Sequence, residues 1–357
     1  MQPSNPHILS IDKLASSLPE FDAIIDVRTP AEFALDHIPG AINFPVLSNE
    51  ERIEIGTLYK QASPFVAKKL GAAYVSRNIA NHLENSLIDL PREWRPLIYC
   101  WRGGERSGAF THILNRIGWK ALQLQSGYQG FRRVVINDLD QAAKDFSFQV
   151  IAGMTGSGKT RILQEIGLLG QQILDLEGLA IHRGSVLGNE TNIAQPSQKG
   201  FETNLWHALN SLDPSKIVFV ESESKKVGGL HIPDPLMERI RDGQCIELRS
   251  STHTRVSWLL REYHHFLSNP ESFKEKLSLL TSRYGKEQIT KWHEAIDAGD
   301  FEGLVEELLV MHYDPSYQSS IIRNFPSYRE NHFVELEDDS DEAFAKTAKD
   351  LITKLGL

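Results

Sequence analysis

A single cysteine, Cys100, ends an apolar run in the stretch LIYCWRGGERSG, and a glycine-rich loop with two arginines follows it directly. The two glycines allow successive backbone N–H groups to turn toward one point, and a helix beginning at the end of the loop would add its positive end. The arginines add full charges. These features stabilise a thiolate, so we expect Cys100 to be a nucleophile. The anion-binding candidates in its loop are Arg102, Gly103, Gly104, Arg106 and Ser107.

The width of this loop bears on which anion it holds. Five residues, Trp101 to Glu105, separate the cysteine from Arg106. The same C-x5-R spacing is typical of cysteine phosphatases, and a loop of this width accommodates a tetrahedral anion the size of phosphate. The spacing alone therefore leaves two activities open: hydrolysis of a phosphate ester, and transfer from a phosphorylated chalcogen donor.

A second anion site is indicated by GMTGSGKT (153–160), which fits the pattern G-x-x-x-x-G-K-[ST] between an expected strand and an expected helix. Its backbone N–H groups would surround a β-phosphate, its lysine would neutralise the charge, and its threonine could hold Mg²⁺. The diphosphate-binding candidates are Gly153, Gly156, Ser157, Gly158, Lys159 and Thr160. No nucleobase-reading motif such as the N-K-x-D of GTPases accompanies the loop.

Acidic residues follow two later strands. Glu221 and Glu223 end VFVESES, where a phosphate-loop fold places an acid that positions metal or water. ILDLEGLAIHRGS offers Asp175 and Glu177 as further acids of this kind, and His182 and Arg183 as substrate contacts or second-step residues. Helix caps and solvated charges explain each of these residues equally well.

The elements that must position these residues form two successive α/β series. We expect strands at 21–28, 41–46, 95–100 and 120–127, with a helix at 107–118, and then strands at 146–153, 171–178, 216–224, 243–250 and 332–337. The periodicity becomes helical from about residue 253, and a last helix covers 341–356. We therefore predict a first domain at 1–135, a linker at 136–145, and a phosphate-loop domain at 146–357 with a helical C-terminal part.

Composition limits the remaining possibilities. The chain has 357 residues, a net charge of −9, two cysteines and no apolar run of membrane-spanning length. The N-terminal stretch lacks a signal-peptide layout, and two cysteines make no disulfide framework, so we expect a cytoplasmic protein. Cys245 is expected to be a buried core thiol. No His–Cys cluster with metal-ligand spacing occurs, so no resident metal and no tightly bound cofactor are expected.

A negatively charged chain has no general attraction for nucleic acid, so contact with RNA would need a local basic patch. The candidates for such a patch are Arg249, Arg255 and Arg261, together with Lys225 and Lys226.

The first half resembles rhodanese domains. IDVRTPAEFALDHIPGAINFP (25–45) is similar to their N-terminal signature, and YCWRGGERS to their active-site loop. The resemblance implies a cysteine that carries sulfur or selenium. One departure concerns the loop, because rhodanese domains commonly have four residues between the cysteine and the last arginine, and this chain has five.

The order of the two domains, together with DLEGLAIHRGS and VESESKKVG in the second, resembles the tRNA 2-selenouridine synthase family over essentially the whole chain. The resemblance implies a bacterial enzyme that acts on the wobble 2-thiouridine of tRNA. It implies that geranyl diphosphate first alkylates the sulfur, and that selenium from selenophosphate then replaces the geranylthio group, with Cys100 as the selenium-carrying residue. It also connects Gly71, in KKLGAAYV, with geranylation; a helix C-cap is the plainer interpretation. The resemblance further implies contact with an enzyme that produces selenophosphate. It implies no contact with a membrane.

Two other classes stay open from the residues alone. One is a cysteine phosphatase or sulfurtransferase domain fused to a phosphate-loop module that binds a nucleotide. The other is a sulfur carrier or regulatory protein without catalytic activity, in which the phosphate loop senses a nucleotide.

Overall fold

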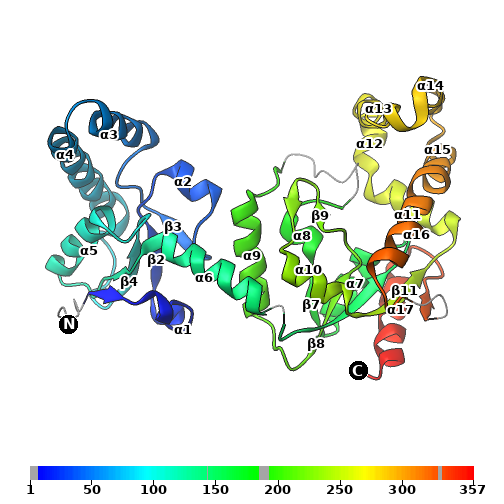
Figure 1. Cartoon of the computed structure of the whole chain (residues 1–357), viewed down its shortest axis with the longest axis horizontal. Coiled ribbons are helices and arrows are strands. Elements are labelled where there is room, and N and C mark those ends of the chain that lie inside the picture. Colours follow the sequence, from blue (N-terminus) through cyan, green and yellow to red (C-terminus); the bar gives the residue numbers. More distant parts are fainter. Residues whose placement is uncertain (1–6, 143, 185–192, 329–331) are drawn as a thin grey trace. The chain divides into compact units, whose positions relative to one another are not determined.

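The protein consists of two compact units, each built on a five-stranded parallel sheet (Figure 1). The computed structural model describes residues 7–142, 144–184, 193–328 and 332–357. The first unit comprises 1–138 and 196–207, and the second comprises 139–195 and 208–357. Among the described residues, no helix has both the length and the apolar character needed to cross a membrane.

The first sheet has the strand order β1-β5-β4-β2-β3. Its strands are β1 (Ile8–Leu9), β2 (Ala23–Asp26), β3 (Ala41–Asn43), β4 (Pro96–Tyr99) and β5 (Leu122–Leu124). Its helices and helical turns are η1 (Ile11–Lys13), α1 (Leu14–Ser17), η2 (Leu18–Glu20), α2 (Pro30–Leu35), α3 (Asn49–Gln61), α4 (Pro64–His82), η3 (Leu83–Leu87), α5 (Glu105–Ile117) and α6 (Gly127–Ala142). Cys100 directly follows β4 and so lies at the carboxyl edge of the sheet, where α/β folds bind ligands.

The second sheet has the order β12-β11-β6-β8-β7. Its strands are β6 (Ser147–Ala152), β7 (Gln172–Leu174), β8 (Ile217–Glu221), β11 (Gln244–Arg249) and β12 (Phe333–Glu335), and a hairpin of β9 (Lys226–Val227) and β10 (Leu230–His231) stands apart. The helices are α7 (Lys159–Leu168), α8 (Leu176–Ala180), α9 (Gln198–Asn210), α10 (Asp234–Arg241), α11 (Thr252–Glu262), α12 (His264–Ser268), α13 (Pro270–Ser278), α14 (Thr281–Ala298), α15 (Phe301–Leu308), η4 (Leu309–Tyr313), α16 (Asp314–Asn324) and α17 (Asp341–Leu355).

This arrangement confirms the predicted α/β class and the predicted strands and helices; the strands are shorter than predicted, and the helix expected at 107–118 begins at Glu105 and ends at Ile117. The strand β1 was not predicted, because two residues carry no readable pattern. Cys245 is buried in β11, as predicted, and burial raises the pKa of its thiol. Strand β6 lies between β8 and β11, so the loop that follows it stands beside the end of β8, where Glu221 pairs with Ile151.

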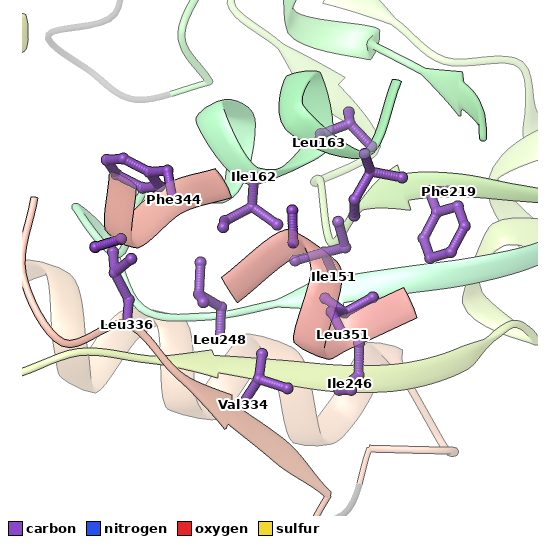
Figure 2. Packing of buried hydrophobic residues seen from close by; sticks show 13 residues of the cluster. Ile151, Ile162, Leu163, Phe219, Ile246, Leu248, Val334, Leu336, Phe344 and Leu351 are labelled. Atoms are coloured by element: carbon purple, nitrogen blue, oxygen red, sulfur yellow. The ribbon is translucent and has the colours of Figure 1, made fainter. Parts of the chain in front are cut away.

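One face of the second sheet is covered by α7 and α17. Figure 2 shows Ile162 of α7 and Phe344 and Leu351 of α17 packed over Ile151 of β6 and Leu248 of β11. All five side chains are at most 1% exposed. The last helix of the chain therefore completes the core that supports the phosphate loop.

Two helices have residues in both units. Residues 136–142, which we assigned to the linker, continue α6, and α9 begins among the residues of the first unit. Inside that unit, Arg132 of α6 donates to Thr203 (3.1 Å) and forms an ion pair with Glu202, both on α9. Thr203 in turn donates to Asp36 at 3.1 Å. The segment 196–207 is thus an integral part of the first unit, which the sequence did not indicate.

The dependence of the second unit on α17 can be tested with Leu351→Ala. Removing this fully buried side chain should lower the free energy of unfolding of the second unit by about 2–5 kcal/mol, because it leaves a cavity in the core. Leu168→Ala, at a position that is 77% exposed on α7, is the matched control and should stay within about 0.5 kcal/mol of the wild type. Hydrogen exchange of β6 and β11 peptides in increasing urea measures both, and equal effects would contradict the packing described.

Candidate active site: two anion loops

The first candidate site is the loop between β4 and α5, in which Cys100 is 4% exposed. The backbone N–H of Gly104 donates to its sulfur at 3.3 Å, and the hydroxyl of Ser107 donates at 3.2 Å. Gly104 is also the N-cap of α5, so the positive end of that helix faces the sulfur. Two hydrogen-bond donors and the N-terminal end of a helix therefore converge on the sulfur.

The loop is held from behind by the turn that begins α6. Tyr128 N–H donates to the carbonyl oxygen of Cys100 at 2.8 Å, and Gln129 N–H to that of Trp101 at 2.9 Å. Gly127 adopts φ 51°, and a Cβ there would overlap the carbonyl oxygen of Cys100. Because only glycine fits so close to the loop, the turn fixes where the cysteine backbone lies.

Gln123 of β5 is a functional residue that sequence reasoning missed. Its side-chain amide donates to the carbonyl oxygens of Gly103 (2.6 Å) and Gly104 (3.1 Å) and to the hydroxyl of Ser107 (2.9 Å). These bonds orient the hydroxyl that contacts the sulfur. No motif could have identified it, because it lies on a neighbouring strand.

The two arginines of the loop differ in their surroundings. Arg102 is exposed, whereas Arg106 is partly buried and donates to Glu32 at 3.2 Å. Burial favours the neutral carboxyl of Glu32, but the Arg106 guanidinium outweighs it and holds the pKa of Glu32 below its usual value. Arg106 is thereby oriented by α2, whereas Arg102 stands at the surface.

Gly71 lies in neither loop. It is in the middle of α4, where an added Cβ would lie 3.4 Å from Ile55 of α3. The helix continues to His82, so the interpretation of Gly71 as a C-cap is wrong. The glycine instead allows the two helices to approach.

The second candidate site is the loop between β6 and α7. Gly158 caps α7 at φ 81°, and a Cβ there would lie 2.5 Å from the ring of Phe344, so the loop packs directly on α17. Lys159 donates from Nζ to the carbonyl oxygen of Gly153 at 2.8 Å. Ser157 is 1% exposed, and its hydroxyl has no hydrogen-bond partner among the described residues.

Two residues from the helical C-terminal part support this loop. Tyr317 of α16 accepts from the N–H of Gly153 at 2.6 Å, and its ring lies 5.6 Å from the ammonium group of Lys159. Arg255 of α11 donates to the carbonyl oxygen of Thr155 at 2.8 Å and forms a 2.5 Å ion pair with Asp314. Neither residue belongs to a recognisable motif, and Tyr317 was missed.

The position of Arg255 corrects the predicted RNA-facing patch. Arg255 is 3% exposed, because its guanidinium is used to hold the phosphate loop. The other candidates are partly or fully exposed, but several are paired: Arg249 with Glu247, Arg261 with Asp339, and Lys225 with Asp234. The interpretation of Arg255 as an RNA contact is therefore wrong.

Three carboxyl groups meet beside the phosphate loop. One oxygen from each of Glu177, Glu221 and Glu223 lies within 4.8 Å of the others. Thr160 donates its hydroxyl to Glu177 at 3.1 Å, while Oε1 of Glu221 is buried and has no hydrogen-bond partner in the described part of the chain. Clustered oxygen ligands with an unpartnered buried carboxylate atom suit a hard divalent cation such as Mg²⁺.

Burial makes these carboxyl groups difficult to ionise. Desolvation, and then the negative charges of Glu221 and Glu223, raises the pKa of Glu177. Desolvation also raises the pKa of Glu221 to about 8 and that of Glu223 in the same direction, although the positive charge of Lys159 opposes both shifts. A cation at this place would reverse the shifts, because it favours the carboxylate form.

Most of the predicted site residues of the second domain line one cavity of about 680 Å³; Gly153 and Ser157 of the phosphate loop do not. Its lining includes Lys159, Thr160, Asp175, Glu177, His182, Arg183, Glu221 and Glu223. Asp175 caps α8 by accepting from the N–H of Gly178 at 2.8 Å, and Arg183 donates to the carboxylate of Glu262 at 2.8 Å. His182 is buried at the wall of the cavity. Asp175 therefore acts as a cap beside the three glutamates, which form the cluster without it.

Comparisons with known proteins find relatives for both halves of the chain. A family model described as "tRNA 2-selenouridine synthase AAA domain" matches residues 146–329, and one described as "Rhodanese-like domain" matches residues 10–133. A tRNA 2-selenouridine synthase of Nitrosomonas europaea is 36% identical over 263 residues, which cover 72% of this chain and 68% of that protein. One of Shewanella pealeana is 30% identical over 327 residues, covering 84% of this chain and 88% of that protein. Among solved structures, a rhodanese-like domain protein of Staphylococcus aureus is 21% identical and covers 35% of this chain and 89% of that chain, with a TM-score of 0.23.

The raised pKa values predict how stability depends on pH. Between the ordinary glutamate value of 4.5 and about 8, the native state keeps a proton on Glu221 that the unfolded chain has lost. The free energy of unfolding of the metal-free second unit should therefore fall as the pH rises through this range, by up to about 1.4 kcal/mol per pH unit for each such group.

Glu221→Gln should reduce the fall in the free energy of unfolding with rising pH. Glu275→Gln, at an exposed position on α13, is the control and should leave that fall unchanged. Urea unfolding followed by hydrogen exchange of β6 and β8 peptides at pH 5, 6.5 and 8 measures it. An unchanged slope in Glu221→Gln would show that this carboxyl group is not protonated in the native state.

Proposed function

The chain belongs to the tRNA 2-selenouridine synthase family, and we propose that it converts 2-thiouridine at the wobble position of tRNA into 2-selenouridine in two steps. Geranyl diphosphate first alkylates the sulfur, and selenophosphate then supplies selenium. The observation that supports this most is the presence in one chain of two glycine-rich loops, one that surrounds a cysteine in the first unit and one beside three glutamates in the second.

The first step needs a site that stabilises a departing diphosphate. The thiocarbonyl sulfur attacks C1 of the geranyl group, the C1–O bond breaks, the diphosphate leaves, and N3 of the base loses its proton. Negative charge grows on the diphosphate, so we assign Lys159 and the backbone N–H groups of the phosphate loop to this step. Their charge and direction favour the transition state over the bound donor.

Mg²⁺ would be held by Thr160 and the carboxylates of Glu177, Glu221 and Glu223. When bound, it would neutralise charge on the diphosphate oxygens. The glutamates keep their protons more readily without a cation, so we expect Mg²⁺ binding to release protons and to strengthen as the pH rises. No other cofactor is part of the proposal.

The second step uses the cysteine loop. Sulfur in a thiocarbonyl is a poor leaving group, but the alkylated sulfur can leave C2 as neutral geranylthiol. We assign Cys100 to selenium delivery, and we assign Arg102, Gly103, Gly104, Arg106 and Ser107 to the phosphate part of selenophosphate. The width of the C-x5-R loop suits that anion, and the hydrogen bonds from Gly104 and Ser107 hold the sulfur of Cys100 in place within the loop.

The macromolecular partner is tRNA, and we further propose transient contact with the enzyme that makes selenophosphate. The chain carries a net charge of −9, so tRNA binding must use local positive groups rather than the overall field. Exposed Arg102, beside the cysteine, is one such group.

The two steps should separate by mutation. Cys100→Ala should still produce geranylated tRNA and fail to convert it to selenouridine, because the sulfur of the base is the nucleophile of the first step. Lys159→Ala should reduce geranylation by about a hundredfold or more, since a charged contact to a departing anion contributes several kcal/mol. It should retain selenation of tRNA that is already geranylated.

Mass spectrometry of tRNA nucleosides measures both products. Lys349→Ala, an exposed lysine of α17, is the matched control and should leave both steps unchanged. Loss of geranylation in a folded Cys100→Ala protein would contradict the division of labour. Loss of selenation of pre-geranylated tRNA in Lys159→Ala would contradict it too, and would favour one shared site.

A further inference from the structure

A second, smaller cavity lies beside the phosphate loop. Its walls come from α11, α12, α13, α15 and η4, and its volume is about 50 Å³. The apolar side chains that form most of it include Leu259, Leu260, Phe273, Val305, Leu308 and Leu309. Among its lining residues, only Thr155, Tyr263 and Tyr313 carry a polar side-chain atom. An apolar cavity of this kind favours a hydrocarbon group over water.

This small cavity adjoins the large one that contains the phosphate loop. The two share four lining residues, Thr155, Leu259, Tyr263 and Tyr313. The large cavity also contains Lys159 and Thr160. A ligand with a phosphate group on the loop could therefore extend an attached group past Leu259 into the apolar space.

The lining also argues against a nucleobase in this space. A purine or pyrimidine has donors and acceptors along its edges, and burying them without partners costs several kcal/mol. The side chains of Val305, Leu308 and Leu309 offer no such partners. A hydrocarbon group has no polar atoms that need hydrogen-bond partners, so it can be buried against this wall without that free-energy cost.

We propose that this apolar cavity binds the terminal isoprene unit of a prenyl diphosphate whose diphosphate group is held by the phosphate loop. The inference rests on the proposed function, because it extends the same donor site. One water molecule occupies about 10–15 Å³ of such a cavity. A cavity of about 50 Å³ therefore holds about four groups of that size, which is close to the five carbon atoms of one isoprene unit. The first isoprene unit of a geranyl chain then crosses the large cavity beside Trp258 and Leu259.

The cavity predicts a dependence on chain length. Isothermal titration of the full chain with Mg²⁺ should be made with inorganic pyrophosphate and with dimethylallyl, geranyl and farnesyl diphosphates. Geranyl diphosphate should bind at least about tenfold more tightly than dimethylallyl diphosphate, because only its second unit enters the cavity. Farnesyl diphosphate should gain nothing further, since the cavity has room for one unit.

Val305 tests the cavity directly, because its side chain is half-buried at the wall. Val305→Trp should fill the space and reduce geranyl diphosphate to the affinity of dimethylallyl diphosphate, with pyrophosphate binding unchanged. Val305→Ala should enlarge the cavity and so raise the affinity for farnesyl diphosphate relative to that for geranyl diphosphate. This variant tests the cavity even if Val305→Trp does not fold. Val310→Trp, in η4 at a position that is 57% exposed, is the matched control and should behave as the wild type.

The outcomes distinguish this inference from the function on which it rests. Equal affinities for pyrophosphate and all three prenyl diphosphates would overturn the chain cavity and leave the diphosphate site standing. Failure of every diphosphate to bind the wild-type protein would overturn the proposed function together with the cavity. A ratio of farnesyl to geranyl diphosphate affinity that stays at the wild-type value in Val305→Ala would also count against the cavity.

Discussion

The second unit buries three glutamates together beside the phosphate loop, and the cost of ionising them there is the constraint on which its candidate site depends. Glu177, Glu221 and Glu223 have raised pKa values because burial removes the water that would stabilise their carboxylates, and Lys159 offsets only part of that effect. Lys159 meanwhile donates to the carbonyl oxygen of Gly153, which keeps its ammonium group over the loop. Such a site is ready for a ligand that brings both a divalent cation and a polyanion, since each would neutralise the charge that the other introduces.

The two glycine-rich loops are held in their conformations in similar ways. A loop that offers backbone N–H groups to an anion must be fixed by other contacts, because its own backbone is turned toward the ligand. In the first unit, Gln123 and the turn at Gly127 hold the cysteine loop from behind. In the second, Arg255 and Tyr317 hold the phosphate loop, and the ring of Phe344 packs beneath it. The conformation of each loop therefore depends on residues that lie outside the loop.

The first unit is completed by a segment from later in the chain. Residues 196–207 reach it through a buried polar network in which Asp36 accepts hydrogen bonds from Tyr128 (2.7 Å) and Thr203 (3.1 Å). Burial raises the pKa of Asp36, and the hydrogen bonds and the nearby Arg132 oppose that shift. Buried networks of this kind are costly when one member is removed, so these hydrogen bonds tie the segment to the unit. The phosphate-loop half of the sequence thus supplies part of the rhodanese-like unit.

The sequence by itself determined the two α/β series, the strands that end in Cys100 and in Glu221, and the two loops, because these depend on local patterns: apolar runs, glycines and charges at fixed spacing. It also suggested the family. Only the tertiary structure decided that Glu177 joins Glu221 and Glu223 while Asp175 caps a helix, because strands β7 and β8 become neighbours only in the sheet. It also decided that Arg255 is buried beneath the phosphate loop, and that Gln123 and Tyr317 support the sites. These roles depend on contacts between residues far apart in the chain, and such contacts leave no spacing that a sequence can reveal.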